Sequence, residues 1–200
     1  MKKDVMNSYN EIAELYDAET SESQMSKEYD YIINKFLKFI DNGFILDVGC
    51  GSSPFTTNNT KTIGVDFSIG QLNQCSNDIV PLIQADMTKL PIRTKSFDGL
   101  MALYSLIHIP RDSKLSVLKE FKRVVKDDGY ILIVEGSNEW EGSNENWLDS
   151  DTTMKWDMSG PDKTKNQLEK VGFEIIEKIN VQSSLGEGDC KTFFLVKNTI

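Results

Sequence analysis

The sequence predicts a doubly wound α/β fold, in which a sheet of seven strands, parallel except for the last, lies between helices. Short apolar segments of strand length alternate along the chain with segments whose apolar residues recur at helical spacing. This alternation is typical of parallel strands joined by right-handed helical crossovers. The last two strand segments are joined only by a turn, so they must pair antiparallel. A length of 200 residues suits one domain, predicted over residues 1–200.

Two helices are predicted before the first strand. Apolar residues recur at helical spacing over residues 8–18 and 26–40, and Ser26 is a candidate N-cap for the second helix. Residues 1–42 therefore lie outside the predicted sheet and form a candidate lid.

The remaining elements follow in chain order. Ser68 is a candidate cap of a short helix, and Asp127-Asp128-Gly129 is a candidate stop for a longer one. Residues 56–60 are poor helix formers, so little helix is expected between the first two strands. Residues 186–189 form a candidate hairpin turn. Strands are predicted at 44–48, 62–66, 79–84, 97–103, 130–135, 173–181 and 192–196, and helices at 69–76, 112–126 and 161–171.

The most informative segment is Ile-Leu-Asp-Val-Gly-Cys-Gly at residues 45–51, followed nineteen positions after Asp47 by a second acid, Asp66. A strand that runs into Gly-x-Gly lets the backbone approach a ligand, because glycine has no Cβ. An acid at the tip of the next strand can accept hydrogen bonds from a ribose diol. The sequence therefore predicts a nucleoside cofactor at the carboxyl ends of parallel strands.

Two departures separate this loop from a dinucleotide site. Pro54 stands where the third glycine of Gly-x-Gly-x-x-Gly is expected, and Asp47 would repel a pyrophosphate but attract an ammonium group. Asp-x-Gly-x-Gly with a later acid resembles motif I of the class I S-adenosylmethionine-dependent methyltransferases, and the resemblance extends from about Tyr9 to Val196. It implies a Rossmann-like sheet with S-adenosyl-L-methionine as cofactor and S-adenosyl-L-homocysteine as product.

The resemblance also implies which residues hold the cofactor. Asp47 and the backbone of Gly49–Gly51 would hold its amino-acid end, and Asp66 would hold the ribose. Asp86 and Met87 would frame the adenine, and Leu103 would offer main chain near the sulfonium. The full set of expected cofactor-binding residues is Tyr16, Asp47, Gly49, Cys50, Gly51, Asp66, Phe67, Asp86, Met87 and Leu103.

The segment from Tyr9 to Asp17 resembles the Tyr-Asp-x-x-Ala-x-x-Tyr-Asp helix of small-molecule methyltransferases, which folds over the cofactor as a lid. Tyr9 and Tyr16 lie seven residues apart, on one face of a helix. Packing of both rings on the core is the alternative interpretation.

His108, the one histidine of the chain, follows the fourth predicted strand at the rim where an acceptor must lie. Its ordinary pKa, about 6.5, suits a general base, so it is a candidate catalytic residue. Transfer of a methyl group from a sulfonium often needs no base, because the donor is already activated. A loop-packing role is therefore the alternative. Asp98 begins this strand, far from the rim, and is interpreted as structural.

Residues 136–160 show no strong periodicity and are interpreted as an irregular lid insert. The insert contains Trp140, Trp147 and Trp156 and resembles a tryptophan-rich insert found in one subgroup of methyltransferases. Its indoles suggest a wall for a flat or cationic acceptor, and its acids would repel an anionic one. The alternative is a solvated loop held to the core by its tryptophans. The expected substrate-binding residues are Tyr9, His108, Trp140, Trp147 and Trp156.

Composition limits the classes of binding partner that the sequence predicts. A formal charge of −9 without a basic stripe argues against nucleic acid, and no apolar run is long enough to span a membrane. Cys50, Cys75 and Cys190 fit no metal-ligand spacing and are interpreted as free thiols of a cytoplasmic protein. No metal is expected, and the oligomeric state is not predicted.

The sequence thus predicts methyl transfer from S-adenosylmethionine to a small-molecule O, N or S atom. Two alternatives stay open: a non-catalytic protein that binds S-adenosylmethionine or S-adenosylhomocysteine, and an NAD-dependent oxidoreductase.

Overall fold

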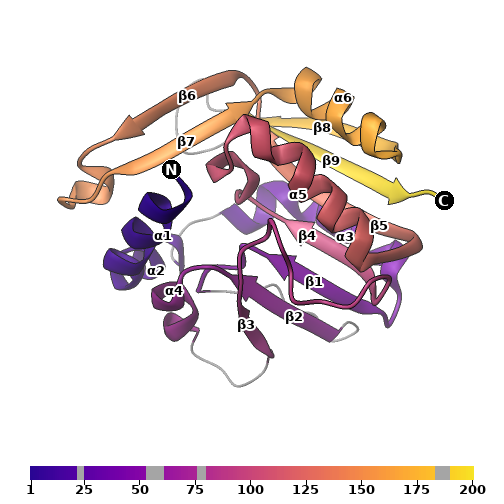
Figure 1. Cartoon of the computed structure of the whole chain (residues 1–200), viewed down its shortest axis with the longest axis horizontal. Helices are drawn as coiled ribbons and strands as arrows, with labels where there is room; N and C mark the ends of the chain where they lie inside the picture. The colour runs from indigo at the N-terminus through magenta and orange to yellow at the C-terminus, as the bar shows by residue number, and fades with distance from the viewer. Residues whose placement is uncertain (22–24, 53–60, 76–79, 183–189) are drawn as a thin grey trace.

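A seven-stranded sheet forms the centre of the computed structural model, which describes residues 1–21, 25–52, 61–75, 80–182 and 190–200 (Figure 1). Its order is β3-β2-β1-β4-β5-β9-β8. The neighbours from β3 to β5 pair parallel, whereas β9 is antiparallel to both β5 and β8. The predicted fold class is therefore confirmed. The strands are β1 (Phe44–Val48), β2 (Lys61–Asp66), β3 (Leu82–Gln84), β4 (Phe97–Ala102), β5 (Val125–Gly136), β8 (Phe173–Gln182) and β9 (Cys190–Asn198).

Two apolar layers cover the two faces of the sheet because neighbouring strand residues point to opposite sides. On β5, Ile131 and Ile133 join the layer under α5, whereas Leu132 and Val134 join the layer under α3. Helices α3 and α5 lie on opposite faces of the sheet, whereas α1, α2 and α4 lie together at one end of it (Figure 1). The helices are α1 (Lys2–Glu11), α2 (Ala13–Ser21), α3 (Met25–Ile40), α4 (Ile69–Gln74), α5 (Arg111–Val124) and α6 (Pro161–Val171).

Element boundaries agree with the prediction to within a few residues at most positions. Ser68 caps α4 as predicted, since its hydroxyl accepts a hydrogen bond from the Gln71 amide. Gly172 ends α6 in the left-handed conformation, with φ of 88°. Two predictions were wrong: Ser26 lies inside α3, which begins at Met25, and β5 begins at Val125 directly after α5. The expected lack of helix at 56–60, the turn at 186–189 and the predicted strand start at residue 79 lie outside the described residues.

The insert between β5 and α6 is regular, contrary to the prediction. It forms an antiparallel hairpin of β6 (Glu139–Asn144) and β7 (Met154–Ser159), with a short 3-10 turn, η2 (Trp147–Asp149), between the strands. Side chains of β6 are almost all exposed, so neither face of this strand needs apolar residues. The period-2 signal of a half-buried strand is therefore missing from the sequence.

The helix predicted over residues 8–18 is instead two helices that meet at Ile12. The ψ angle of Ile12 is 16°, which breaks the helical geometry, and α1 extends back to Lys2. Across seven residues of a straight helix, the rings of Tyr9 and Tyr16 would be separated by about 10 Å along the axis. The bend instead brings their centroids to 5.3 Å, edge to face.

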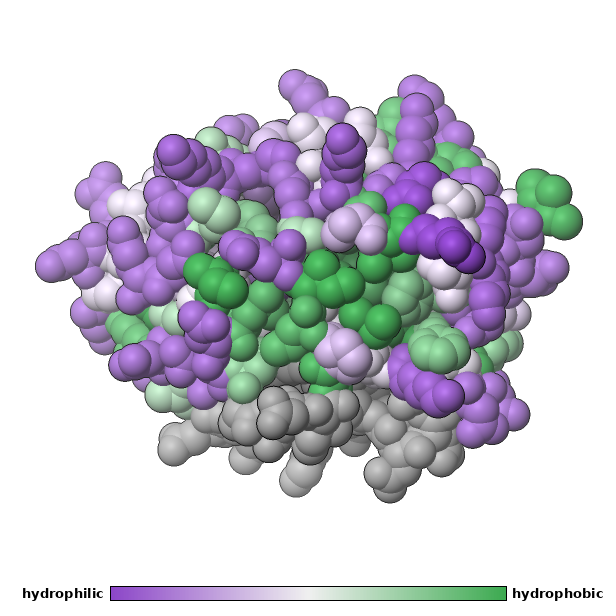
Figure 2. All heavy atoms as spheres, turned by 60° about the horizontal axis from the view of Figure 1, so that its bottom comes forward, coloured by the Kyte–Doolittle hydropathy of each residue, from purple (hydrophilic) through white to green (hydrophobic). Residues whose placement is uncertain are grey.

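The side of the molecule where α4 and β3 lie carries apolar side chains at its centre, with polar ones above them and on both sides (Figure 2). Ile63, Ile83 and Ile92 are half-buried members of the core layer on β2, β3 and the following loop. Among the described residues, no helix is both long and apolar enough to cross a membrane.

Candidate active site

A partly enclosed cavity of about 690 Å³ lies at the carboxyl ends of β1, β2 and β4. This is the edge at which ligands bind in open α/β sheets. Helices α1 and α2 cover it from one side. Its lining residues are Lys2, Tyr9, Tyr16, Val48, Gly49, Gly51, Val65, Asp66, Phe67, Gln71, Ala85, Asp86, Met87, Leu103, Tyr104, Ser105, His108 and Ile109.

The glycine loop after β1 presents bare backbone to this cavity. The Gly49 and Cys50 amides both donate to the Val65 carbonyl, at 2.7 and 3.1 Å, which ties the loop to β2. Gly49 has a φ of 75°, and a Cβ there would lie 2.3 Å from the Cβ of Ser105. The local backbone therefore requires glycine, and a ligand can approach the main chain closely.

Asp66, at the end of β2, is the buried acid of the cavity, with 7% of its surface exposed. Its carboxylate accepts hydrogen bonds from the Gly51 amide at 2.9 Å and from the Ser68 amide at 2.8 Å. Burial raises its pKa, and the backbone amides of Ser68, Gly51 and Phe67 oppose that rise. A carboxylate has about four acceptor positions, so these bonds leave capacity for a ligand hydroxyl.

Gln71 is a site residue that sequence analysis missed. It is 1% exposed, lines the cavity, and its Oε1 atom has no hydrogen-bond partner among the described residues. A Cβ built on Gly51 would lie 3.6 Å from this oxygen, so the amide is beside the glycine loop. A buried acceptor with no partner costs stability unless a ligand satisfies it. The glycines, Asp66 and Gln71 together fit a nucleoside with hydroxyl and amino donors.

Asp86 lines the cavity but is engaged by the chain itself. Lys2 Nζ lies 2.6 Å from its Oδ2, and the Thr88 amide and hydroxyl donate to its Oδ1 at 2.8 and 2.7 Å. Burial raises the pKa of Asp86, but these hydrogen bonds outweigh it and hold the pKa below its ordinary value. The predicted adenine contact thus stays a prediction, and Lys2 was not foreseen.

His108 is held between α1 and β7. Its Nδ1 lies 2.8 Å from the Lys155 carbonyl, which can only accept, so Nδ1 carries the proton. Its Nε2 therefore accepts from the Tyr9 hydroxyl, at 2.9 Å. Burial lowers the pKa of His108 to about 4, and burial likewise raises the pKa of Tyr9 well above its ordinary value. Both groups are neutral at pH 7.

The tryptophans form a layer behind these residues and do not line the cavity. Trp147 packs edge to face on Tyr9, with ring centroids 5.6 Å apart, and Trp156 lies 5.9 Å from His108. Trp140 is 44% exposed and contacts Trp156 at 6.1 Å. Of the expected substrate-binding residues, the structure therefore brings only Tyr9 and His108 to the cavity wall.

Contacts between α1 and β7 place the two covering segments together, although they are far apart in sequence. Ser8 Oγ donates to the Thr153 carbonyl at 2.7 Å, just before β7, and Lys155 pairs with Asp4 at 2.7 Å. Arg111, at the start of α5, binds Asp157 of β7 through its backbone amide and its guanidinium. The hairpin is thus fixed to both α1 and α5.

Eight of the ten expected cofactor-binding residues line the cavity. Asp47 and Cys50 do not: Asp47 is buried at the end of β1, and Cys50 Sγ lies 3.6 Å from the Gly51 carbonyl. Asp98 is structural as predicted, since it accepts from the Phe44 amide at 2.9 Å and pairs with Lys126. Residues outside the motifs, such as Lys2 and Gln71, carried no spacing signal that could have revealed them.

Comparison with known proteins gives a consistent result. Residues 46–133 match the family described as methyltransferase domain. The chain is 28% identical over 132 residues to the uncharacterized protein MJ1252 of Methanocaldococcus jannaschii, covering 66% of this chain and 51% of that protein. It is 24% identical over 161 residues to an O-methyltransferase of Pyrenophora dematioidea, covering 70% and 58%. The chain thus spans about half the length of these curated relatives.

A solved structure shares the fold over nearly the whole chain. An S-adenosylmethionine-dependent methyltransferase from Clostridium acetobutylicum superposes with a TM-score of 0.70 at 18% identity, covering 96% of this chain and 99% of that one. The family match over residues 46–133, this shared fold and the glycine loop with its two acids agree, and they make the chain similar to S-adenosylmethionine-dependent methyltransferases.

Proposed function

We propose that this protein transfers the methyl group of S-adenosyl-L-methionine to an O, N or S atom of a small, uncharged or cationic molecule. The observation that carries the proposal is the cavity itself, where the Gly49–Gly51 backbone, the Asp66 carboxylate and the unsatisfied Gln71 oxygen face one space. When bound, the cofactor would supply an activated methyl group on a positively charged sulfur.

The residues of the chain would bind the cofactor and orient it. Asp66 would accept hydrogen bonds from the ribose, and Gln71 Oε1 would accept one from a neighbouring donor of the cofactor. The glycine loop would let the amino-acid end lie against main chain, with Asp47 contributing negative charge from below. Leu103, Phe67 and Met87 would provide apolar contacts along the cavity wall.

The covering segments would exclude water and act as a lid. Tyr9 and Tyr16 close the cavity from α1 and α2, and Trp147 packs behind both rings, 5.6 Å from each. Exclusion of water favours transfer from a charged sulfonium, because a dry site strengthens electrostatic interactions.

His108 would orient Tyr9 and would not act as a general base. A pKa of about 4 makes it a weak proton acceptor at pH 7, and its Nε2 already accepts from Tyr9. The acceptor would then lose its proton to solvent or to a later step, as an activated donor permits.

The charge of the cavity supports an acceptor that is not anionic. Asp66 and Asp86 line it, and Lys2 is the sole lysine or arginine among the described lining residues. Lys2 is paired with Asp86 at 2.6 Å and leaves no free cation for an acidic group. We propose no role in binding nucleic acid or membranes, given the formal charge of −9.

Calorimetry with S-adenosylmethionine, S-adenosylhomocysteine and NADH tests the cofactor. The first two are expected to bind, and Asp66→Ala is expected to weaken S-adenosylmethionine by about 1–3 kcal/mol, the scale of hydrogen bonds to a charged group. Asp98→Ala, which removes a carboxylate at the opposite end of the sheet, should leave the affinity unchanged. Binding of NADH alone would favour the oxidoreductase.

Turnover of methyl-labelled donor tests the reaction. The assay uses a panel of neutral, cationic and anionic small molecules that carry O, N or S nucleophiles. Transfer to neutral or cationic members is expected. Tight cofactor binding with no transfer to any member would favour a non-catalytic binding protein.

A further inference from the structure

We propose that the ammonium group of Lys2 competes with the adenine of the cofactor for the Asp86 carboxylate. This inference rests on the proposed binding of S-adenosylmethionine. Cofactor binding would then displace Lys2, so this side chain would set cofactor affinity and couple binding to movement of α1.

The Asp86 carboxylate is the acceptor for which the two groups would compete. Its Oδ1 accepts from the Thr88 amide and hydroxyl at 2.8 and 2.7 Å, so its Oδ2 is the oxygen directed at other donors. Lys2 Nζ occupies that oxygen at 2.6 Å and also donates to Thr88 Oγ1 at 3.1 Å. An ammonium group and an exocyclic amine are both hydrogen-bond donors, so they would use Oδ2 in the same way.

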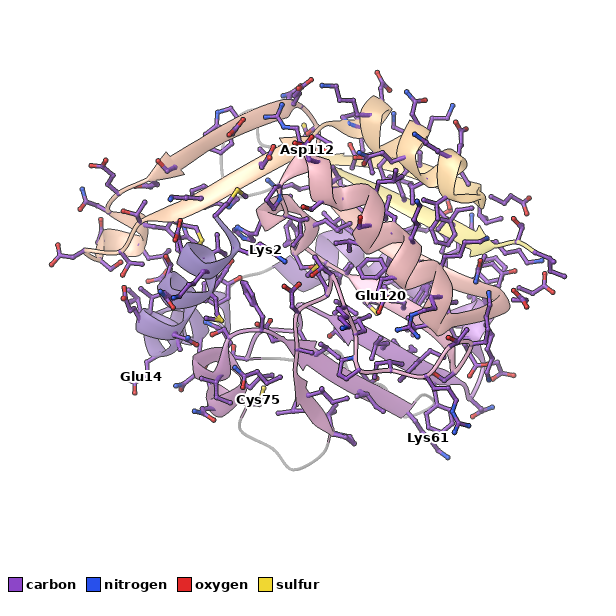
Figure 3. The ribbon with its side chains drawn as sticks, viewed as in Figure 1. Lys2, Glu14, Lys61, Cys75, Asp112 and Glu120 are labelled. Carbon is purple, nitrogen blue, oxygen red and sulfur yellow. The ribbon has the colours of Figure 1, made fainter. Side chains whose placement is uncertain are left out.

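The pair also stands between two spaces. The cavity of about 690 Å³ and an outer groove of about 780 Å³ share Lys2, Phe67, Ala85 and Asp86 in their walls. Figure 3 labels Lys2, whose side chain extends from α1 toward the loop that follows β3. Release of Lys2 from Asp86 would therefore join the cavity to the groove beside the adenine position.

The Lys2–Asp86 ion pair is weak enough for an incoming adenine to displace it. The Lys2 and Asp86 side chains are 36% and 42% exposed, so water screens the ion pair. Exposed pairs of this kind contribute little to stability. An incoming adenine therefore has to overcome only a small interaction, and the resulting effect on affinity is expected to be a few-fold.

Other contacts of α1 would transmit the displacement of Lys2 to neighbouring elements. Asn10 Oδ1 accepts from Ser68 Oγ and from the Gly70 amide, at 2.7 and 2.8 Å, which ties the far end of α1 to α4. On the same helix, Tyr9 is held by its hydrogen bond to His108, which lies in the turn after β4. Lys2 thus lies at one end of α1, and the other end of α1 contacts α4, the helix that follows Asp66.

Calorimetric titration with S-adenosylmethionine tests the proposal in the full chain. Lys2→Met keeps an unbranched side chain of similar bulk and removes the charge, and it is expected to tighten binding roughly two- to fivefold. Lys3→Met removes the same charge from the next residue of α1, where the side chain is exposed, and should match the wild type. Circular dichroism melts would show that each variant is folded.

A double-mutant cycle tests whether the effect acts through Asp86. Asp86→Ala is expected to weaken binding, and Lys2→Met should give no further gain in that background. Equal or weaker binding by Lys2→Met in the wild-type background would overturn the competition. If the wild type binds neither S-adenosylmethionine nor S-adenosylhomocysteine, the proposed function itself fails, and the inference fails with it.

Discussion

The Tyr9 hydroxyl donates to His108 Nε2 across 2.9 Å and so joins a helix at the start of the chain to the turn after β4. The Lys155 carbonyl fixes the other ring nitrogen, which leaves Nε2 as the acceptor. Through these two hydrogen bonds, His108 joins three segments beside the cavity: α1, the 3-10 turn η1 (Leu106–His108) and β7.

Tyr9→Phe should destabilise the protein by about 1–3 kcal/mol, because it leaves the buried His108 Nε2 without a donor. Urea unfolding at pH 7 measures this change. Tyr31→Phe is the matched control, since Tyr31 is 64% exposed and its hydroxyl lies 3.5 Å from Glu177. The control should change stability by less than about 0.5 kcal/mol. Equal effects of the two substitutions would contradict the role of the Tyr9–His108 bond.

His108 should make stability depend on pH. Its pKa is about 4 in the folded protein and about 6.5 when unfolded, so the unfolded state binds the proton more tightly. Its contribution is fully present above pH 6.5 and is lost as the pH falls toward 4, with about 2 kcal/mol lost between pH 7 and pH 5.

Urea unfolding of wild type and His108→Asn at both pH values isolates this term. Other groups, including Asp66 with its raised pKa, titrate in both proteins and cancel in the difference. The stability gap between the two proteins should shrink by the amount lost from His108. A gap that stays constant from pH 7 to pH 5 would mean that His108 is not held neutral by burial.

Gln71→Leu should affect the free and ligand-bound protein differently. In the free protein it removes a buried oxygen that has no described partner, together with the long 3.4 Å hydrogen bond from Nε2 to the Tyr9 carbonyl, so stability should change by less than about 1 kcal/mol. With S-adenosylmethionine, loss of that acceptor should weaken binding by about 0.5–1.5 kcal/mol. Gln74→Leu on the same helix, away from the cavity lining, is the control for both measurements. Unchanged affinity in Gln71→Leu would remove Gln71 from the site.

The Lys114–Glu135 pair, buried between α5 and the end of β5, should be costly to break. Its side chains are 2% and 0% exposed and its charged atoms lie 2.7 Å apart. Lys114→Met would leave Glu135 as a buried charge without its partner and should cost about 3–5 kcal/mol. The double variant Lys114→Met with Glu135→Leu should recover most of that loss in urea unfolding.

Lys165→Met is the surface control for this pair. Lys165 lies 3.7 Å from Glu169 one helical turn away, with both side chains about half exposed. Its loss should cost less than about 0.5 kcal/mol. A similar cost for Lys114→Met would show that the buried pair is no stronger than an exposed one.

The sequence by itself determined the sheet and the glycine loop. Apolar runs such as 44–48 and the turn chemistry of Gly49 and Gly51 are local properties, and alternation of strand and helix fixes where the carboxyl ends meet. Asp66 and the antiparallel last strand followed from the same local patterns.

Only the tertiary structure decided which segments cover the cavity and which residues form hydrogen bonds or ion pairs with its polar side chains. The contacts of Lys2 with Asp86 and of His108 with Lys155 join residues 84 and 47 positions apart, so no local spacing encodes them. The β6–β7 hairpin was likewise hidden, because its strands are stabilised by contacts such as Arg111 with Asp157 and show no apolar alternation. Local sequence determines elements through backbone preference and periodicity, whereas long-range side-chain pairing depends on where the folded chain brings those elements.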